Sequence, residues 1–359
     1  MRNHESEAVS HDNKVETFQY FKWLPLEIKE KIWRSLDPAS IKKLRLVSKF
    51  LKTEVERPEL WSWATLRLTQ NNQAAALESE LVCLVAEVQL SDSLTTSQVF
   101  RAMLGKKDKF RQLVKIGVWS TNLTDVDPAL FRALGSIQVC HLDSCILTDE
   151  QKATIFSVIK ERENLQLRDL NIWGRRVEMS SLEPGLLRSV VRLESCRLSF
   201  TRLTPQQVST IFRAIQETEE LKLRDLNISW TNVSSLEPRL FSSVVRLASC
   251  HLADTRLTQQ QVSTIFTAIQ ENKDLELQDL NISGANVSSL QPSLFRSVVR
   301  LASCNLSSTR LSRQQISTIF TAIEKTKDVK LRVLNISGVD VSFLEPGLRQ
   351  TVGKVRIIR

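Results

Sequence analysis

Apolar residues recur at a fixed spacing over the second half of the chain. Leu236, Leu290 and Leu344 share one register, and Cys196, Cys250 and Cys304 share another with the same period. A fixed period of this kind is typical of an array of stacked units, each of which contacts mainly its neighbours. The pattern therefore predicts a solenoid and not a closed domain around a single core.

Each period divides into two units. The first contains Leu221 and Leu223, and the second contains Val245 and Leu247. Because these pairs alternate at period two, each predicts a short strand with one apolar face. We expect the strands to start at these pairs, with Asn227 and Cys250 facing inward at the turns that follow. The predicted steps alternate in length, a shorter one from Leu221 to Val245 and a longer one from Val245 to Leu275.

The longer unit closes with an amphipathic helix. Thr258 is a candidate N-cap for a helix from Gln259 to Glu271. Its apolar residues recur at i, i+3, i+4 and i+7, which gives one buried stripe. They are Val262, Ile265, Phe266 and Ile269. The shorter unit has room only for a short helix, which we expect to start near Pro238.

Both units resemble the leucine-rich repeat signature, L-x-x-L-x-L-x-x-N/C-x-L. Their lengths and helices are most similar to the ribonuclease-inhibitor class of these repeats. That resemblance implies an α/β solenoid with parallel strands on the concave face and helices outside.

A different pattern stands near the start of the chain. Leu24-Pro25-Leu26-Glu27 predicts a helix start, and Asp37-Pro38 predicts its end and the cap of a second helix. Ser48 is a candidate cap for a third. Three short helices in some forty residues bury little core by themselves, so we expect apolar surface that a partner covers.

This block resembles the F-box, and the match includes Leu24-Pro25-x-Glu27-Ile28, Leu36-Asp37-Pro38 and Leu44-Arg45-Leu46-Val47-Ser48-Lys49. By resemblance it docks onto the Skp-type linker subunit of a cullin ubiquitin ligase. The linker-binding candidates are Leu24, Pro25, Ile28, Leu36, Leu44 and Val47. The alternative is that these residues only hold the three helices together.

These patterns divide the chain into three parts. Residues 1–20 are polar and are expected to be disordered, 21–62 form the F-box-like block, and 63–359 form the solenoid. The solenoid is irregular over 63–135 and consists of regular double repeats over 136–359. No Gly, Ser or Pro linker separates the last two parts, so we expect a rigid joint.

Composition narrows the function classes. The net charge of +9 and pI of about 9.3 favour an acidic partner surface, while the lack of a basic run or aromatic platform disfavours nucleic acid. The sequence shows no secretory signal, membrane span or C-x-x-C pair, so we expect a cytoplasmic or nuclear protein without a disulfide framework. The N-x-S sequons at Asn227, Asn232, Asn281, Asn286 and Asn335 arise from duplication of a turn Asn and a following Ser, and we interpret them as unmodified.

Two sets of residues are candidates for binding a client protein. The first is the tryptophans that break the polar pattern just after predicted strands: Trp119, Trp173 and Trp230. The second is the basic residues of a concave face that we expect to be mixed but net basic: Arg192, Lys222, Arg246, Arg300 and Lys330. The alternatives are local packing for the tryptophans and a solvated charge ladder for the others.

Motifs for catalysis are missing from the sequence. No P-loop, G-x-S-x-G or metal-spaced His/Cys/carboxylate cluster occurs, and Cys145 has no base near it in sequence. We therefore expect no enzyme activity and no cofactor. The leading hypothesis is the substrate-recognition adaptor of a Skp–cullin–F-box ubiquitin ligase. The alternatives are a ubiquitin-independent leucine-rich repeat scaffold or inhibitor and, more weakly, a nucleic-acid adaptor.

Overall fold

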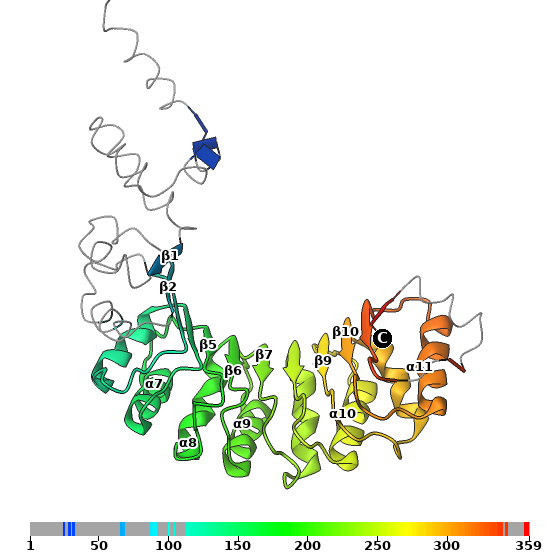
Figure 1. The fold of residues 1–359 in the computed structure, drawn as a ribbon. Helices are drawn as coiled ribbons and strands as arrows, with labels where there is room; N and C mark the ends of the chain where they lie inside the picture. Colours follow the sequence, from blue (N-terminus) through cyan, green and yellow to red (C-terminus); the bar gives the residue numbers. More distant parts are fainter. Residues whose placement is uncertain are drawn as a thin grey trace, which may run out of the picture.

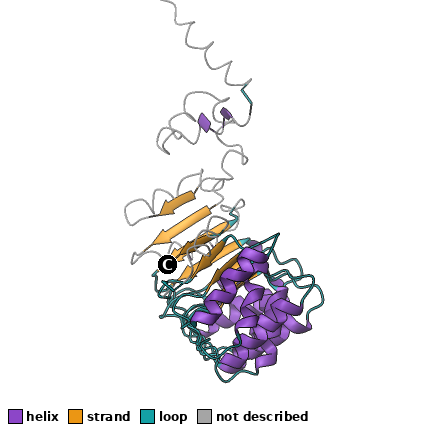
Figure 2. Ribbon diagram, turned by 90° about the vertical axis from the view of Figure 1, so that its right-hand side faces the viewer, coloured by secondary structure: helices purple, strands orange, loops and turns teal. Residues whose placement is uncertain are grey.

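The computed structural model describes residues 24–25, 28–29, 31–32, 65–68, 87–91, 100, 104, 113–339, 342–343 and 355–358. From residue 65 onward the described residues form one curved solenoid. The strands lie on the inner side of the arc and the helices on the outer side (Figure 1). Seen from the side, the sheet and the helices form two separate layers (Figure 2). This is the predicted fold class of the solenoid.

One sheet runs the length of the solenoid. Its 12 strands follow one another in sequence order, and every adjacent pair is parallel. The strands are Thr65–Leu68 (β1), Glu87–Ser91 (β2), Lys115–Trp119 (β3), Val139–Asp143 (β4), Asp169–Asn171 (β5), Ser195–Arg197 (β6), Asp225–Asn227 (β7), Ser249–His251 (β8), Asp279–Asn281 (β9), Ser303–Asn305 (β10), Val333–Asn335 (β11) and Arg356–Ile358 (β12).

Long and short helices alternate between the strands. The long α-helices are Asp149–Glu161 (α7), Pro205–Glu217 (α9), Gln259–Glu271 (α10) and Arg313–Lys325 (α11). The shorter units carry Pro184–Leu187 (α8) and the 3-10 helices Pro128–Ser136 (η4), Arg188–Arg192 (η5), Pro238–Arg246 (η6) and Pro292–Arg300 (η7). The predicted helix bounds at Gln259 and Glu271 and the predicted start near Pro238 are confirmed.

The predicted alternation of steps is confirmed, but the predicted strand register is wrong. The shorter step separates the starts of β7 and β8, Asp225 and Ser249, and the longer step leads on to Asp279 at the start of β9. The strand after Leu223, however, begins at Asp225 and not at Leu221. Leu223 is buried at the approach to the strand, and Leu226 within it. The alternating buried pair of the strand is Leu226 with Ile228, and not Leu221 with Leu223. The strand therefore lies several residues later than predicted.

The shifted register changes which residues face inward at the turns. Cys250 is buried in the middle of β8, and Asn227 lies on the opposite, concave side of β7. The turn position predicted to hold Asn or Cys is occupied mainly by buried threonines, and the hydroxyls of all but Thr231 donate to a backbone carbonyl two or three residues earlier. Thr255 Oγ1, for example, donates to the Leu252 carbonyl at 2.8 Å. The buried threonines are Thr121, Thr201, Thr231, Thr255 and Thr309.

A glutamine in the first turn of each long helix joins two units. Gln261 completes a capping box with Thr258, whose backbone N–H donates to Gln261 Oε1 at 2.9 Å. Its Nε2 donates to the carbonyls of Val233 and Leu236 in the preceding unit, both at 2.8 Å. The side chain is fully buried. The same contacts recur at Gln151, Gln207 and Gln315.

An arginine at the end of each short unit from η5 to η7 joins the other pair of neighbours. Arg246 reaches the last turn of α9 and donates to the carbonyls of Gln216 at 3.0 Å and Thr218 at 2.5 Å. Helix C-termini leave such carbonyls without partners, and a guanidinium satisfies several at once. Arg192 binds the end of α7 and Arg300 the end of α10 in the same way.

Little of the F-box-like block is described. The backbone N–H groups of Ile28 and Lys29 donate to the Pro25 carbonyl at 3.1 Å, so a helix begins just after the proline. Pro25 is exposed, Leu24 is half-buried and Ile28 is 40% exposed. The other linker-binding candidates, Leu36, Leu44 and Val47, lie outside the described residues, as do the polar lead over 1–20 and the predicted joint at 62–64.

Cysteines and sequons fit the repeat in different ways. The five described cysteines are all free and buried, as predicted for Cys196, Cys250 and Cys304, whereas Cys83 lies outside the described residues. The sequon asparagines were expected to be buried, but Asn232 and Asn286 are exposed in loops. Their side chains accept hydrogen bonds from the backbone N–H of Ser234 and Ser288, which gives them a role in the turn.

Candidate partner-binding surface

The concave face carries an unusual polar cluster where β3 to β6 lie side by side. Residues that flank the buried Leu170 and Cys196 point away from the helices, because side chains alternate along a strand. We call these residues, with those beside them on β3 and β4, the concave cluster. It consists of Trp119, His141, Asp143, Asp169, Asn171, Trp173, Ser195 and Arg197.

Two of the predicted tryptophans meet at one carboxylate. The side chains of Trp119 and Trp173 both approach Asp143 and act to lower the pKa of its carboxyl, and the Ser144 backbone N–H donates to the Trp173 carbonyl at 2.6 Å. A methyl group in place of the Gly117 hydrogen would lie 2.4 Å from the Trp119 ring, so that glycine lets the indole fold back over β3. The tryptophans stand out in the sequence, whereas Asp143, which lies on a different strand from either of them, does not.

The neighbouring strands add a second carboxylate and two bases. His141 Nε2 lies 3.5 Å from Asp169 Oδ2. Burial alone would raise the pKa of Asp169, but His141 and Arg197 beside it outweigh the burial and lower that pKa below its ordinary value. At Asp143 burial wins, and its pKa is raised despite the opposing effects of His141 and the two indoles. The two carboxylates of the cluster therefore differ in how readily they ionise.

Several oxygen atoms in the cluster have no hydrogen-bond partner. They include one carboxylate oxygen each of Asp143 and Asp169 and the Asn171 Oδ1. Elsewhere in the repeat the equivalent asparagine accepts a hydrogen bond from the backbone N–H two residues later. These pairs are Asn227 with Ser229, Asn281 with Ser283, Asn305 with Ser307, and Asn335 with Ser337. Asn171, which precedes Trp173 instead of a serine, is released from this role.

We expect Asp143→Asn to stabilise the free protein at neutral pH. A carboxyl whose folded-state pKa is raised costs stability at pH values above that pKa, and the cost disappears as the pH falls below its ordinary value. The amide keeps an acceptor for the indoles without the charge. Thermal unfolding at pH 7 should show a melting temperature about 1–3 °C above wild type, and the gap should close near pH 3. A lower melting temperature at pH 7 would contradict this account.

Trp230, the third predicted tryptophan, lies outside the concave cluster. It is 49% exposed and stacks on Phe200, with ring centroids 4.7 Å apart, while the Arg175 guanidinium lies 5.6 Å from the Phe200 centroid. Phe200 and Trp230 have φ of 62° and 63°, a left-handed conformation that Gly284 and Gly338 provide at the same turn position in later units. Bulky residues are rare there, so the two rings are held in a strained position.

The predicted basic residues lie at the edge of the concave face, where the chain approaches each strand. Arg192, Arg246 and Arg300 end 3-10 helices and bind helix carbonyls, so the expectation that they lie on strands and face the solvent is wrong. Lys222 and Lys330 are exposed and line open hollows. Binding of a client by these five residues stays a prediction.

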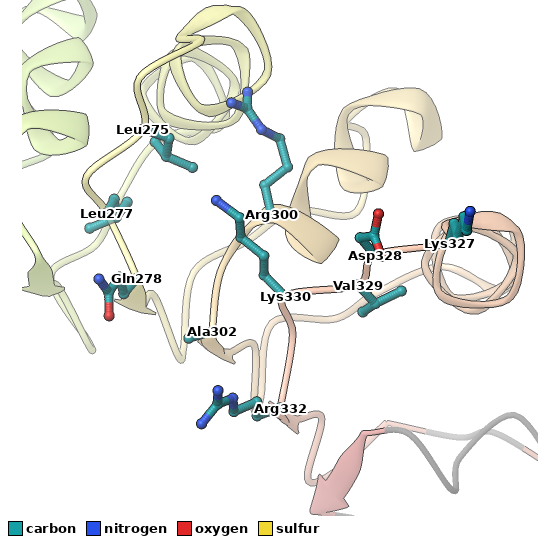
Figure 3. A pocket seen from close by; sticks show the side chains of 10 residues that line it. All are labelled: Leu275, Leu277, Gln278, Arg300, Ala302, Lys327, Asp328, Val329, Lys330 and Arg332. Atoms are coloured by element: carbon teal, nitrogen blue, oxygen red, sulfur yellow. The ribbon is translucent and has the colours of Figure 1, made fainter.

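The largest of these hollows lies near the C-terminal units and has a volume of about 850 Å³. Figure 3 shows Lys330 lying between Arg300 and Arg332 in this hollow, with Leu277 and Gln278 on the opposite side. Basic side chains therefore gather before the strands. The strand positions from β4 to β9 differ, because Asp143, Asp169, Asp225 and Asp279 face only Arg197 and two histidines there. The concave face is therefore net basic at its edge, as predicted, but not at its strand positions.

Burial decides the role of Cys145, the cysteine considered as a possible nucleophile. Cys145 is fully buried, burial raises the pKa of its thiol to about 12, and its Sγ lies 3.4 Å from the Val118 carbonyl. It is a packing residue and not a thiolate nucleophile.

Among the described residues, no three His, Cys, Asp or Glu side chains are arranged to bind a metal ion. None of the helices in this part of the chain is both long and apolar enough to cross a membrane.

The sequence has no match among protein-family models or curated proteins. An internalin from Listeria monocytogenes, known from a crystal structure, aligns over 90% of this chain and 94% of its own, at 13% identity and a TM-score of 0.48. The repeat assignment rests independently on the parallel strand order and the recurring helix caps. On these grounds the described residues from 65 onward form an α/β solenoid, whose repeat resembles the leucine-rich repeat signature.

Proposed function

We propose that the protein is the substrate-recognition subunit of a Skp–cullin–F-box ubiquitin ligase. The F-box-like block docks onto the linker subunit, and the solenoid binds the client protein. A stiff connection between the two then holds client lysines close to the ubiquitin-charged enzyme. The contribution is a raised effective concentration and requires no chemistry from this chain.

The observation that carries the binding half of this proposal is the exposed aromatic and polar surface of the solenoid. Trp173 is 40% exposed beside the unpartnered buried oxygens of the concave face, and Trp230 is 49% exposed at a turn after β7. Monomeric folds seldom leave such groups without a reason, and tryptophans are enriched among the residues that dominate interfaces. The ligase half is supported by the sequence motif and by exposed Pro25 and Ile28 at the start of its first helix.

The ligase half is tested by pull-down of a Skp-type linker subunit. We expect the double variant Leu24→Ala/Pro25→Ala to weaken capture at least tenfold, because both apolar contacts are lost at the interface. Lys31→Ala, on the exposed side of the same helix, is the matched control and should bind like wild type. Undiminished capture by the double variant would contradict the proposal.

A second experiment separates the adaptor from a ubiquitin-independent scaffold or inhibitor. Deletion of residues 1–62 leaves the solenoid but removes the F-box-like block. For an adaptor we expect the client to accumulate in cells while it still binds the truncated protein. If the deletion changes neither the abundance nor the ubiquitination of a bound client, the scaffold hypothesis is favoured.

A further inference from the structure

We propose that the concave cluster is the receptor for an arginine side chain of the client protein. The proposal rests on the function above only in assuming that the solenoid binds a protein. It identifies the chemistry of the contact: a guanidinium that donates to the free oxygens of β4 and β5 while it stacks against Trp173. It also predicts a basic partner surface, because the partner bears an arginine, whereas the net positive charge of the chain favoured an acidic one.

The unpartnered atoms define what the ligand must supply. Asp143 and Asn171 are 7% and 6% exposed, and each has one oxygen without a donor, as does Asp169. His141 Nε2 and Ser195 Oγ in the same cluster are also unpartnered and can act as donors, but the three acceptor oxygens outnumber them. The complementary group is therefore one that supplies N–H donors. A buried acceptor without a donor costs free energy, and this cost is recovered when a donor binds.

The charge of the concave cluster also favours a cationic ligand. The cluster holds two carboxylates, Asp143 and Asp169, against the single permanent cation of Arg197. Asp225 on the next strand adds a further carboxylate. A cation entering this surface is attracted by the acids and favours their ionised forms.

The geometry favours a guanidinium over other cations. Strand pairing aligns His141 with Asn171, which places Asp143 beside Trp173 and diagonally across from Asn171. A planar guanidinium carries five N–H donors and can reach two such acceptors at once, whereas an ammonium acts as a point charge. A flat cation also stacks on an indole face, and Trp173 offers one that is 40% exposed.

The same face contains an internal comparison. β7 and β9 repeat the aspartate and asparagine of β5 as Asp225 with Asn227 and Asp279 with Asn281. There the asparagine oxygen is occupied by a serine N–H, and no tryptophan stands two residues after the asparagine. The cluster on β4 and β5 is therefore a local departure from the repeat. The free oxygens are themselves covered, so we expect the Trp173 side chain to move when the guanidinium enters.

The test uses the full-length protein and the tripeptide acetyl-Gly-Arg-Gly-amide. Titration is followed by the indole N–H signals in ¹H–¹⁵N spectra, with Trp119 and Trp173 assigned by substitution to Phe. We expect both signals to shift with half-saturation in the low millimolar range, which is roughly −4 kcal/mol for an isolated side chain. The same peptide with citrulline, a neutral isostere of arginine, should produce less than a fifth of the shift at equal concentration.

Variants locate the site. Asp143→Asn and Asp169→Asn should each raise the half-saturation concentration at least fivefold. Asp279→Asn removes the equivalent carboxylate from β9 and should change it by less than twofold. Equal shifts with the citrulline peptide, no shift up to about 20 mM, or equal weakening by Asp279→Asn would each overturn the proposal. Failure of the linker subunit to bind would overturn the ligase function and leave this result unaffected.

Discussion

Gln261→Leu is expected to lower the free energy of unfolding by about 3–5 kcal/mol, because each group that loses its partner without gaining water costs about 1–3 kcal/mol. The substitution removes the buried donor to the Val233 and Leu236 carbonyls and the acceptor for the half-buried Thr258 N–H. Urea unfolding followed by far-ultraviolet circular dichroism measures the loss.

The adjacent Gln260 provides the control. Its side chain is exposed, so Gln260→Leu should change stability by less than about 0.5 kcal/mol. Gln261→Glu adds a diagnostic pH dependence, because a carboxylate would face two carbonyl oxygens. Burial raises the pKa of such a carboxyl, so this variant should gain stability as the pH falls from 7 to 5 and the acid protonates. Equal stability of Gln260→Leu and Gln261→Leu would show that the contacts carry no net energy.

Arg246→Ala is expected to lower the free energy of unfolding by about 2–3 kcal/mol, because hydrogen bonds from a charged group contribute more than neutral ones. Its guanidinium donates to four carbonyls at the end of α9, whose C-cap residue, Thr218, has an extended conformation. The positive charge also interacts favourably with the negative end of the helix dipole. Thermal and urea unfolding should both show the loss.

Two further variants separate geometry from charge. Arg246→Lys keeps the charge but lacks the planar fork, so it should recover less than half of the lost stability. Arg239, in the same 3-10 helix, has a side chain that is 78% exposed and pairs only with Glu237, so Arg239→Ala should stay within about 0.5 kcal/mol of wild type. Full recovery with lysine would assign the effect to charge alone.

The helices could be predicted closely because their signals are local. The apolar stripe and the cap at Thr258 lie within one segment, and both agree with the observed bounds of α10. The strand register was less determined, because Leu221, Leu223 and Leu226 offer two apolar spacings and only burial against the helices selects one. The same ambiguity placed Asn227 at a turn instead of on the concave face.

The candidate site was predicted in part. Trp119 and Trp173 stand out because they replace small or polar residues of the repeat. Asp143 and Asn171 could not be recognised, since their importance depends on which strands are neighbours and on which partners are missing. The arginines at 192, 246 and 300 were interpreted as surface charges, because a sequence does not show that a helix end far back along the chain lies within reach of the side chain.

The two kinds of inter-unit contact impose a rule on how this array can grow or shrink. Glutamine ties a short unit to the long unit after it, and arginine ties a long unit to the short unit after it. Loss or gain of a single unit would place two short units or two long units side by side. Backbone carbonyls at that junction would then face no side-chain donor. Modules can therefore be added or removed only as matched pairs, which makes one long unit with its short neighbour the smallest change in length that this architecture tolerates.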